Sequence, residues 1–158
     1  MPEAHALGRI AWQLFVTLTF VRAPKTRSQS LPRLFRWLRD VADMCGSYFP
    51  SLLWVARFEV GPTGGHGHYH VLFAGIPQAL LSDRLCRSLE SAWRTCGGGL
   101  SEVTLYDPAR DGVGYVLKLS AWRGASGAYA AAGTGIGGDD CEPMLSNALI
   151  EAFKRGRI

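Results

Sequence analysis

The chain has 158 residues and a formal net charge of +4, with 47% hydrophobic and 19% charged residues. This length suits one domain with a full core and excludes two ordinary domains, while the composition excludes a disordered chain. The basic excess suits a polyanionic partner without requiring one. The sequence has no apolar run near ~18 residues, no signal segment at its start and no C-x-x-C pair. We therefore expect a cytoplasmic protein with free thiols and no membrane segment.

The first half of the chain predicts two strands separated by a helix. Residues 10–20 alternate apolar side chains with threonines, which is typical of a strand that buries one face. Residues 31–45 place leucines and a valine at helical spacing, with arginines on another side. Residues 52–60 predict a second strand, in which Arg57 and Glu59 lie opposite an apolar face.

Three of the four histidines follow at every second position, after a glycine-rich turn: His66, His68 and His70. Side chains at this spacing share one face of a strand, whereas Tyr69, Val71 and Phe73 point to the other face. Imidazoles lined up on one face of a short strand are typical of a metal site rather than of core packing. This segment therefore predicts metal binding or phosphate chemistry.

The histidine strand and the strand before it predict a hairpin that adds a carboxylate to the site. Any register in which the paired residue numbers add to an odd total puts Glu59 on the same face as His68 and His70. Pairing Glu59 with His68 leaves a loop that the Gly-Pro-Thr-Gly-Gly turn can close. A carboxylate and two imidazoles leave coordination positions open, as a catalytic metal requires. His66, at the turn, is the alternative ligand to Glu59.

The second half of the chain predicts a helix over 80–95, ended by three glycines, and a further strand over 100–106. A stretch of Gly, Ala and Ser then separates the folded part from a terminal apolar pattern. We expect one folded core over 1–123, a flexible linker over 124–143 and a short C-terminal helix in 144–158.

A predicted helix over 111–122 carries a tyrosine and a lysine three residues apart, Tyr115 and Lys118. Side chains at this spacing are neighbours on a helix surface. A phenol has a pKa of about 10 and is a weak nucleophile at neutral pH. A nearby ammonium and an electrophile polarised by a metal would both assist it. The Tyr-x-x-Lys pair has no predictive value alone, since it is frequent by chance.

Taken in order, three segments resemble the three motifs of the HUH (histidine–hydrophobe–histidine) endonucleases. They are Phe15-Val16-Thr17-Leu18-Thr19-Phe20, then His68-Tyr69-His70 with Glu59 upstream, then Tyr115-x-x-Lys118. The resemblance runs over residues 10–120, with the expected order and separations. It is closest to the rolling-circle replication initiators of plasmids and phages.

This resemblance implies an α+β fold, in which a central antiparallel sheet of about five strands is flanked by helices in a ferredoxin-like palm. It implies that Tyr115 attacks a phosphodiester in single-stranded DNA, leaving a 5′-phosphotyrosyl enzyme and a free 3′-hydroxyl. His68, His70 and Glu59 would hold Mg²⁺ or Mn²⁺ against the cleaved phosphate. Lys118 would neutralise the developing negative charge.

Leu119 stands where the two-tyrosine members of this family carry a second tyrosine, which implies a single-tyrosine enzyme. The implied function is site-specific nicking and joining of single-stranded or hairpin DNA at a replication origin, which initiates rolling-circle replication. A relaxase or transposase, and a DNA-binding module that does not cleave, are the alternatives. Without a G-x-x-x-x-G-K-[ST] motif, we expect no nucleotide cofactor and a separate host helicase.

Three arginines are candidate DNA contacts: Arg33, Arg36 and Arg57. The first two lie on the predicted helix 31–45, where they could follow a DNA backbone or form a solvated charged face. Arg57 shares the histidine face, where it could contact phosphate or form a structural ion pair.

Overall fold

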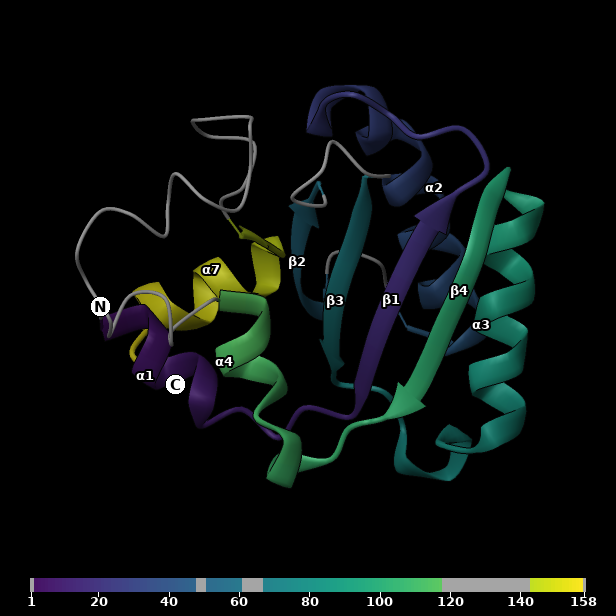
Figure 1. Ribbon diagram of the computed structural model, residues 1–158. Coiled ribbons are helices and arrows are strands. Elements are labelled where there is room, and N and C mark those ends of the chain that lie inside the picture. Colours follow the sequence, from purple (N-terminus) through teal and green to yellow (C-terminus); the bar gives the residue numbers. More distant parts are fainter. Residues whose placement is uncertain (1, 48–50, 61–66, 118–142, 158) are drawn as a thin grey trace.

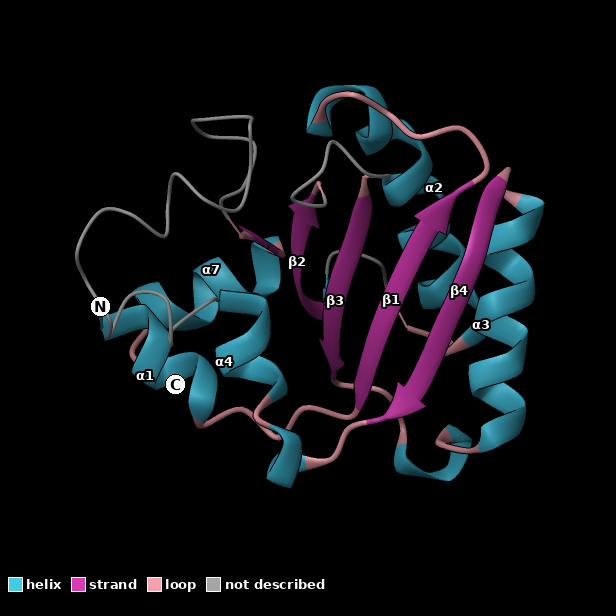
Figure 2. Ribbon diagram, viewed as in Figure 1, coloured by secondary structure: helices cyan, strands magenta, loops and turns pink. Residues whose placement is uncertain are grey.

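The computed structural model describes residues 2–47, 51–60, 67–117 and 143–157. Within these ranges the elements are α1 (Pro2–Gly8), β1 (Leu14–Phe20), α2 (Arg27–Met44), β2 (Leu53–Glu59), β3 (His68–Ala74), η2 (Gln78–Leu80), α3 (Asp83–Thr95), β4 (Gly98–Leu105), η3 (Pro108–Arg110), α4 (Gly112–Leu117), β5 (Met144–Leu145) and α7 (Asn147–Lys154). The strands form one antiparallel five-stranded sheet in the order β4-β1-β3-β2-β5 (Figures 1 and 2). The predicted α+β fold, a sheet flanked by helices, is confirmed.

One face of the sheet is buried under α2 and α3. The alternation predicted for β1 is confirmed, because every second residue from Leu14 to Phe20 is buried on this face. The indoles of Trp37 on α2 and Trp93 on α3 meet edge to face, with ring centroids 6.1 Å apart. Most of the large buried side chains belong to this layer, which is therefore the main core.

On the other face, the described helices pack against β2 and β3. Figure 1 shows α1, α4 and α7 grouped beside these strands, with no described helix in front of β1 and β4. A smaller apolar cluster joins the three helices to the sheet: Leu7, Trp12, Val55, Leu72, Ala74, Val113, Val116 and Leu149. Phe15, Thr17 and Thr104 remain only partly buried on the uncovered strip.

Several elements begin at other residues than the sequence predicts. The helix predicted over 31–45 begins at Arg27, because the Thr26 hydroxyl accepts a hydrogen bond from Gln29 N and caps it. The helix predicted over 80–95 begins at Asp83, where Ser82 caps it in the same way. The helix α1 was not predicted.

The C-terminal segment contains the predicted short helix and, before it, a strand that was not predicted. Met144–Leu145 extends the sheet as β5, with Val55 opposite Leu145, and the helix begins only at Asn147. The segment is therefore part of the sheet architecture rather than a helix alone. The linker predicted over 124–143 lies, apart from Pro143, outside the described residues.

The three described cysteines are free, as expected, and all three are buried: Cys45, Cys86 and Cys96. Burial is the main cause that raises the pKa of the Cys96 thiol to about 11, and this thiol donates to Asp40 Oδ2 at 3.3 Å. None of the described helices combines the length and the apolar character that crossing a membrane would require.

A candidate metal centre beside a tyrosine

The hairpin of β2 and β3 has the predicted register. Glu59 pairs with His68 and Arg57 pairs with His70, so that all four side chains lie on one face. The opposite face buries Tyr69 and its apolar neighbours in the main core. The strand β3 lies between β1 and β2, which fixes the two imidazoles on a central strand.

Glu59, His68 and His70 form a group that could hold a metal ion. The two Nε2 atoms lie 3.1 Å apart, and Glu59 Oε2 lies 3.6 Å from each of them. Metal–ligand bonds of about 2.1 Å place neighbouring ligand atoms roughly 3 Å apart in an octahedral shell, so the three atoms need to move little to share one ion. Nitrogen and carboxylate donors together suit several divalent metals.

The three side chains of the site differ in exposure. The His70 side chain is 7% exposed and that of Glu59 15%, whereas that of His68 is 25% exposed. The group is therefore largely sheltered from solvent and is most accessible at His68.

Thr17 on β1 supports His70 from the other side, and sequence reasoning missed this role. Its register partner is His70, and Thr17 Oγ1 lies 3.2 Å from His70 Nδ1, within hydrogen-bond distance. A partner on Nδ1 leaves Nε2 directed at the metal group. The signal was present in the sequence, since Thr17 points to the face opposite the buried side of its strand.

Arg57 takes part in the site as a structural cation. Its Nε lies 3.5 Å from Glu59 Oε1, and its Nη1 donates to Val116 O at 3.5 Å. The first contact orients the carboxylate so that Oε2 faces the imidazoles. The second connects β2 to α4.

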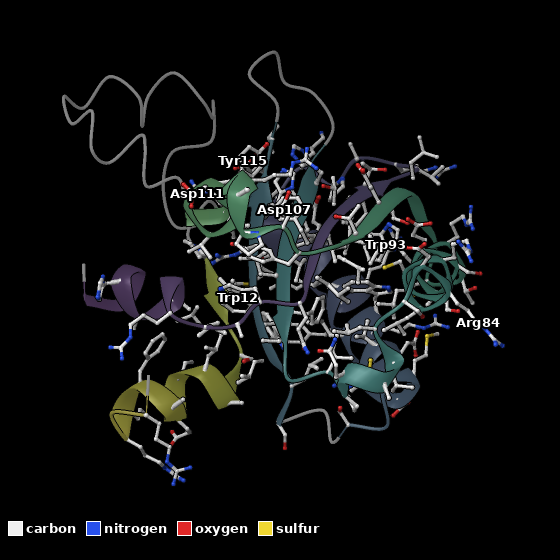
Figure 3. All side chains as sticks on the ribbon, turned by 90° about the horizontal axis from the view of Figure 1, so that it is seen from below. Trp12, Arg84, Trp93, Asp107, Asp111 and Tyr115 are labelled. Atoms are coloured by element: carbon white, nitrogen blue, oxygen red, sulfur yellow. The ribbon has the colours of Figure 1, made fainter. Side chains whose placement is uncertain are left out.

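The short helix α4 brings Tyr115 to the metal group. Its start is fixed by Asp111, which has a positive φ of 46° and accepts a hydrogen bond from Gly114 N at 3.1 Å. The Tyr115 ring stands edge-on to the His70 ring, with centroids 4.9 Å apart, and is 48% exposed. Figure 3 shows Tyr115, Asp107 and Asp111 in the same part of the view, well away from Arg84.

The structure describes only two of the other predicted site residues, and it places both on the opposite side of the sheet. Arg33 and Arg36 lie on α2, across the sheet from the histidines, with the Arg33 guanidinium 5.5 Å from the Phe20 ring centroid. Lys118 and His66 lie outside the described residues. The structure thus brings together the three metal candidates, Arg57 and Tyr115.

A cavity of ≈ 300 Å³ adjoins His70 and Tyr115 on the uncovered strip of the sheet. Its other lining residues are Phe15, Thr17, Glu102, Thr104, Leu105, Tyr106, Asp107, Arg110 and Gly112. Burial is the main cause that raises the pKa of the Tyr106 phenol above its ordinary value. Sequence reasoning did not predict this cavity, because residues from β1, β4 and the following turn meet only through sheet pairing.

Comparison of the chain with known protein families, curated proteins and solved structures found no match in any of the three. A function must therefore be inferred from the antiparallel α+β fold and from the Glu59–His68–His70 group.

Proposed function

We propose that this protein cuts and rejoins single-stranded DNA at a specific site through a covalent 5′-phosphotyrosine. The observation that carries the proposal is the position of Tyr115, whose ring lies 4.9 Å from that of His70 in the candidate metal group. A phosphate bound at this group would lie near the phenolic oxygen, which is the proximity that nucleophilic attack requires. The net charge of +4 suits a polyanionic substrate.

Glu59, His68 and His70 would hold a divalent cation, which we take to be Mg²⁺ or Mn²⁺. Such an ion, when bound, polarises the phosphoryl oxygens and offsets the charge that develops in the transition state. The carboxylate suits both ions, and the two imidazoles favour Mn²⁺. Arg57 keeps Glu59 oriented, and the phosphate would bind between the ion and Tyr115, which stands beside His70.

Tyr115 is the proposed nucleophile. Its Oη forms a bond to phosphorus as the bond from phosphorus to the 3′ oxygen breaks, which leaves the 5′ phosphate on the enzyme and a free 3′-hydroxyl. The phenolic proton passes to water, and the leaving oxygen takes a proton from water. One phosphodiester replaces another, so the step needs no nucleotide cofactor and can run backward to join strands. Lys118, three residues further along the chain, would neutralise charge on the phosphate.

The released 3′-hydroxyl can prime DNA synthesis. The proposed substrate is therefore single-stranded or hairpin DNA at a replication origin, and the proposed role is the start of rolling-circle replication in the cytoplasm. A separate host helicase would open the duplex, since the chain has no phosphate-binding loop motif. Arg33 and Arg36 stay candidates for backbone contacts made across the sheet from the site.

The test is a covalent adduct. The protein is incubated with a pool of single-stranded oligonucleotides and Mn²⁺, and a protein–DNA band is sought on a denaturing gel. Tyr115→Phe should abolish the band and leave the fold intact, because the ring is half exposed and loses only a hydroxyl. Tyr129→Phe serves as the matched control and should keep the band. An adduct that persists in Tyr115→Phe, or that maps to another tyrosine, would overturn the assignment.

A further inference from the structure

The cavity beside Tyr115 is suited to a ligand other than the metal. His70 and Tyr115 line it, whereas Glu59 and His68 do not. It therefore extends from the proposed cleavage point in the direction of β1 and β4. Its volume of ≈ 300 Å³ lies at the lower end of the range of about 300–1,000 Å³ for small-molecule sites, which suits one nucleotide unit rather than a long ligand.

Aromatic rings supply much of the wall: Phe15, Tyr106 and Tyr115. Phe15 and Tyr115 already pack edge to face, with centroids 6.1 Å apart. Flat aromatic surfaces beside a phosphodiester site are where nucleobases stack. The remaining wall adds hydroxyls, two carboxylates and a guanidinium, which can hydrogen-bond to the polar edge of a base.

The polar groups stand on different elements. Thr17 is paired with His70 on one side and with Glu102 on the other, so the three form one row across β3, β1 and β4. Glu102 is an exposed carboxylate on a sheet strand. Asp107 is less available, because its Oδ1 accepts a hydrogen bond from Ala109 N at 3.0 Å. Arg110 belongs to the turn η3 that follows β4.

We propose that this cavity binds a guanine base of the DNA strand next to the cleaved phosphodiester, which rests on the proposed function. A carboxylate such as Glu102 accepts from the adjacent N1–H and N2–H groups of guanine. An arginine such as Arg110 donates to guanine O6 and N7. Adenine offers no carbonyl to the guanidinium, and thymine offers one N–H only. Cytosine offers a single amino group to the carboxylate and a smaller ring to the aromatic wall.

The test measures binding in the absence of cleavage. Fluorescein-labelled nonamers (dT)₄-dX-(dT)₄, with X as each of the four bases, are titrated with protein in EDTA and followed by fluorescence anisotropy. The dG nonamer should bind about tenfold more tightly than the dT nonamer. Glu102→Gln should reduce this ratio to about twofold or less, because an amide cannot accept from both N–H groups. Glu151→Gln, an exposed carboxylate on α7, should keep the full ratio.

Equal binding of the four nonamers, tightest binding of dC, or an unchanged ratio in Glu102→Gln would each overturn the guanine assignment. A guanine preference without any covalent adduct would support the cavity and overturn the proposed reaction. Adduct formation by a protein that binds all four nonamers equally would support the proposed reaction and overturn the guanine assignment.

Discussion

At the scale of single residues, the contact with Thr17 selects the tautomer of His70 and so the ring nitrogen that can bind a metal. A neutral imidazole carries its proton on one nitrogen, and the partner of that nitrogen selects which one. If Nδ1–H donates to Thr17 Oγ1, which is 3.2 Å away, the lone pair on Nε2 faces His68 Nε2 and Glu59 Oε2. Partners of this kind change metal affinity by roughly 10- to 100-fold.

Thr17→Val should therefore weaken Mn²⁺ binding by about tenfold or more, while Thr17→Ser should restore it. Calorimetric titration gives the affinities, and imidazole ¹⁵N chemical shifts of the metal-free protein report the tautomer of His70. The matched control is Thr104→Val, because Thr104 lies on β4, two strands away from β3. Unchanged affinity and tautomer in Thr17→Val would contradict the positioning role.

At the scale of elements, Ser146 attaches the C-terminal segment to the sheet. Its hydroxyl oxygen accepts from Leu149 N at 3.3 Å, which caps α7, and from Trp54 N at 3.2 Å, which lies on β2. Its own backbone N–H donates to Trp54 O at 3.0 Å. Ser146 is buried, so water cannot replace these bonds. One side chain thus ends β5, starts α7 and holds both against β2.

Ser146→Ala should lower the free energy of unfolding by about 1–3 kcal/mol, because two buried backbone N–H groups lose their acceptor. Urea denaturation measures the loss. Ser82→Ala removes the cap of α3, where the hydroxyl accepts from Leu85 N alone and is exposed, and it should cost less. A smaller loss for Ser146→Ala than for Ser82→Ala would show that the contact to β2 contributes nothing.

Strand pairing was the most predictable part of this fold and of its site. Side chains alternate between the two faces of a strand. Both β2 and β3 show such an alternation in sequence, and when their apolar faces are matched, every possible register places Glu59, His68 and His70 on the same face. The start of α1 had no comparable signal. That helix is short and is held by tertiary contacts, among them the buried Leu7, whose carbonyl accepts from Trp12 Nε1 at 2.9 Å. The cavity was hidden for a similar reason, because Glu102 meets Thr17 only through β1–β4 pairing.

At the scale of the whole molecule, the sheet separates the main core, which stabilises the fold, from the candidate site. The large aromatic core lies under α2 and α3, and the metal group lies on the opposite face, between α4 and the uncovered strip. Glu59 comes from β2 and the two histidines from β3. An ion that connects the two strands would bind the folded chain and not the unfolded one. Metal binding should therefore stabilise the entire domain.

Mn²⁺ at 100 times its dissociation constant should stabilise the protein by about 2.7 kcal/mol, which corresponds to a rise in melting temperature of roughly 5–10 °C. EDTA should reverse the rise. His70→Ala should abolish it, since one of three ligands is lost, and His5→Ala, an exposed histidine on α1, should keep it. Differential scanning calorimetry provides the readout. An equal rise in His70→Ala would place the bound ion elsewhere.

The candidate site has one part on α4 and another on β2 and β3. The small apolar cluster that attaches α1, α4 and α7 to the sheet leads us to expect different thermal stabilities for these two parts. Regions with few buried apolar contacts open at a lower free energy than the global core. Tyr115 belongs to the layer held by the small cluster, whereas Glu59, His68 and His70 belong to strands that the main core supports. On warming, the layer that carries the tyrosine would open first. The candidate metal group would then outlast the proposed nucleophile.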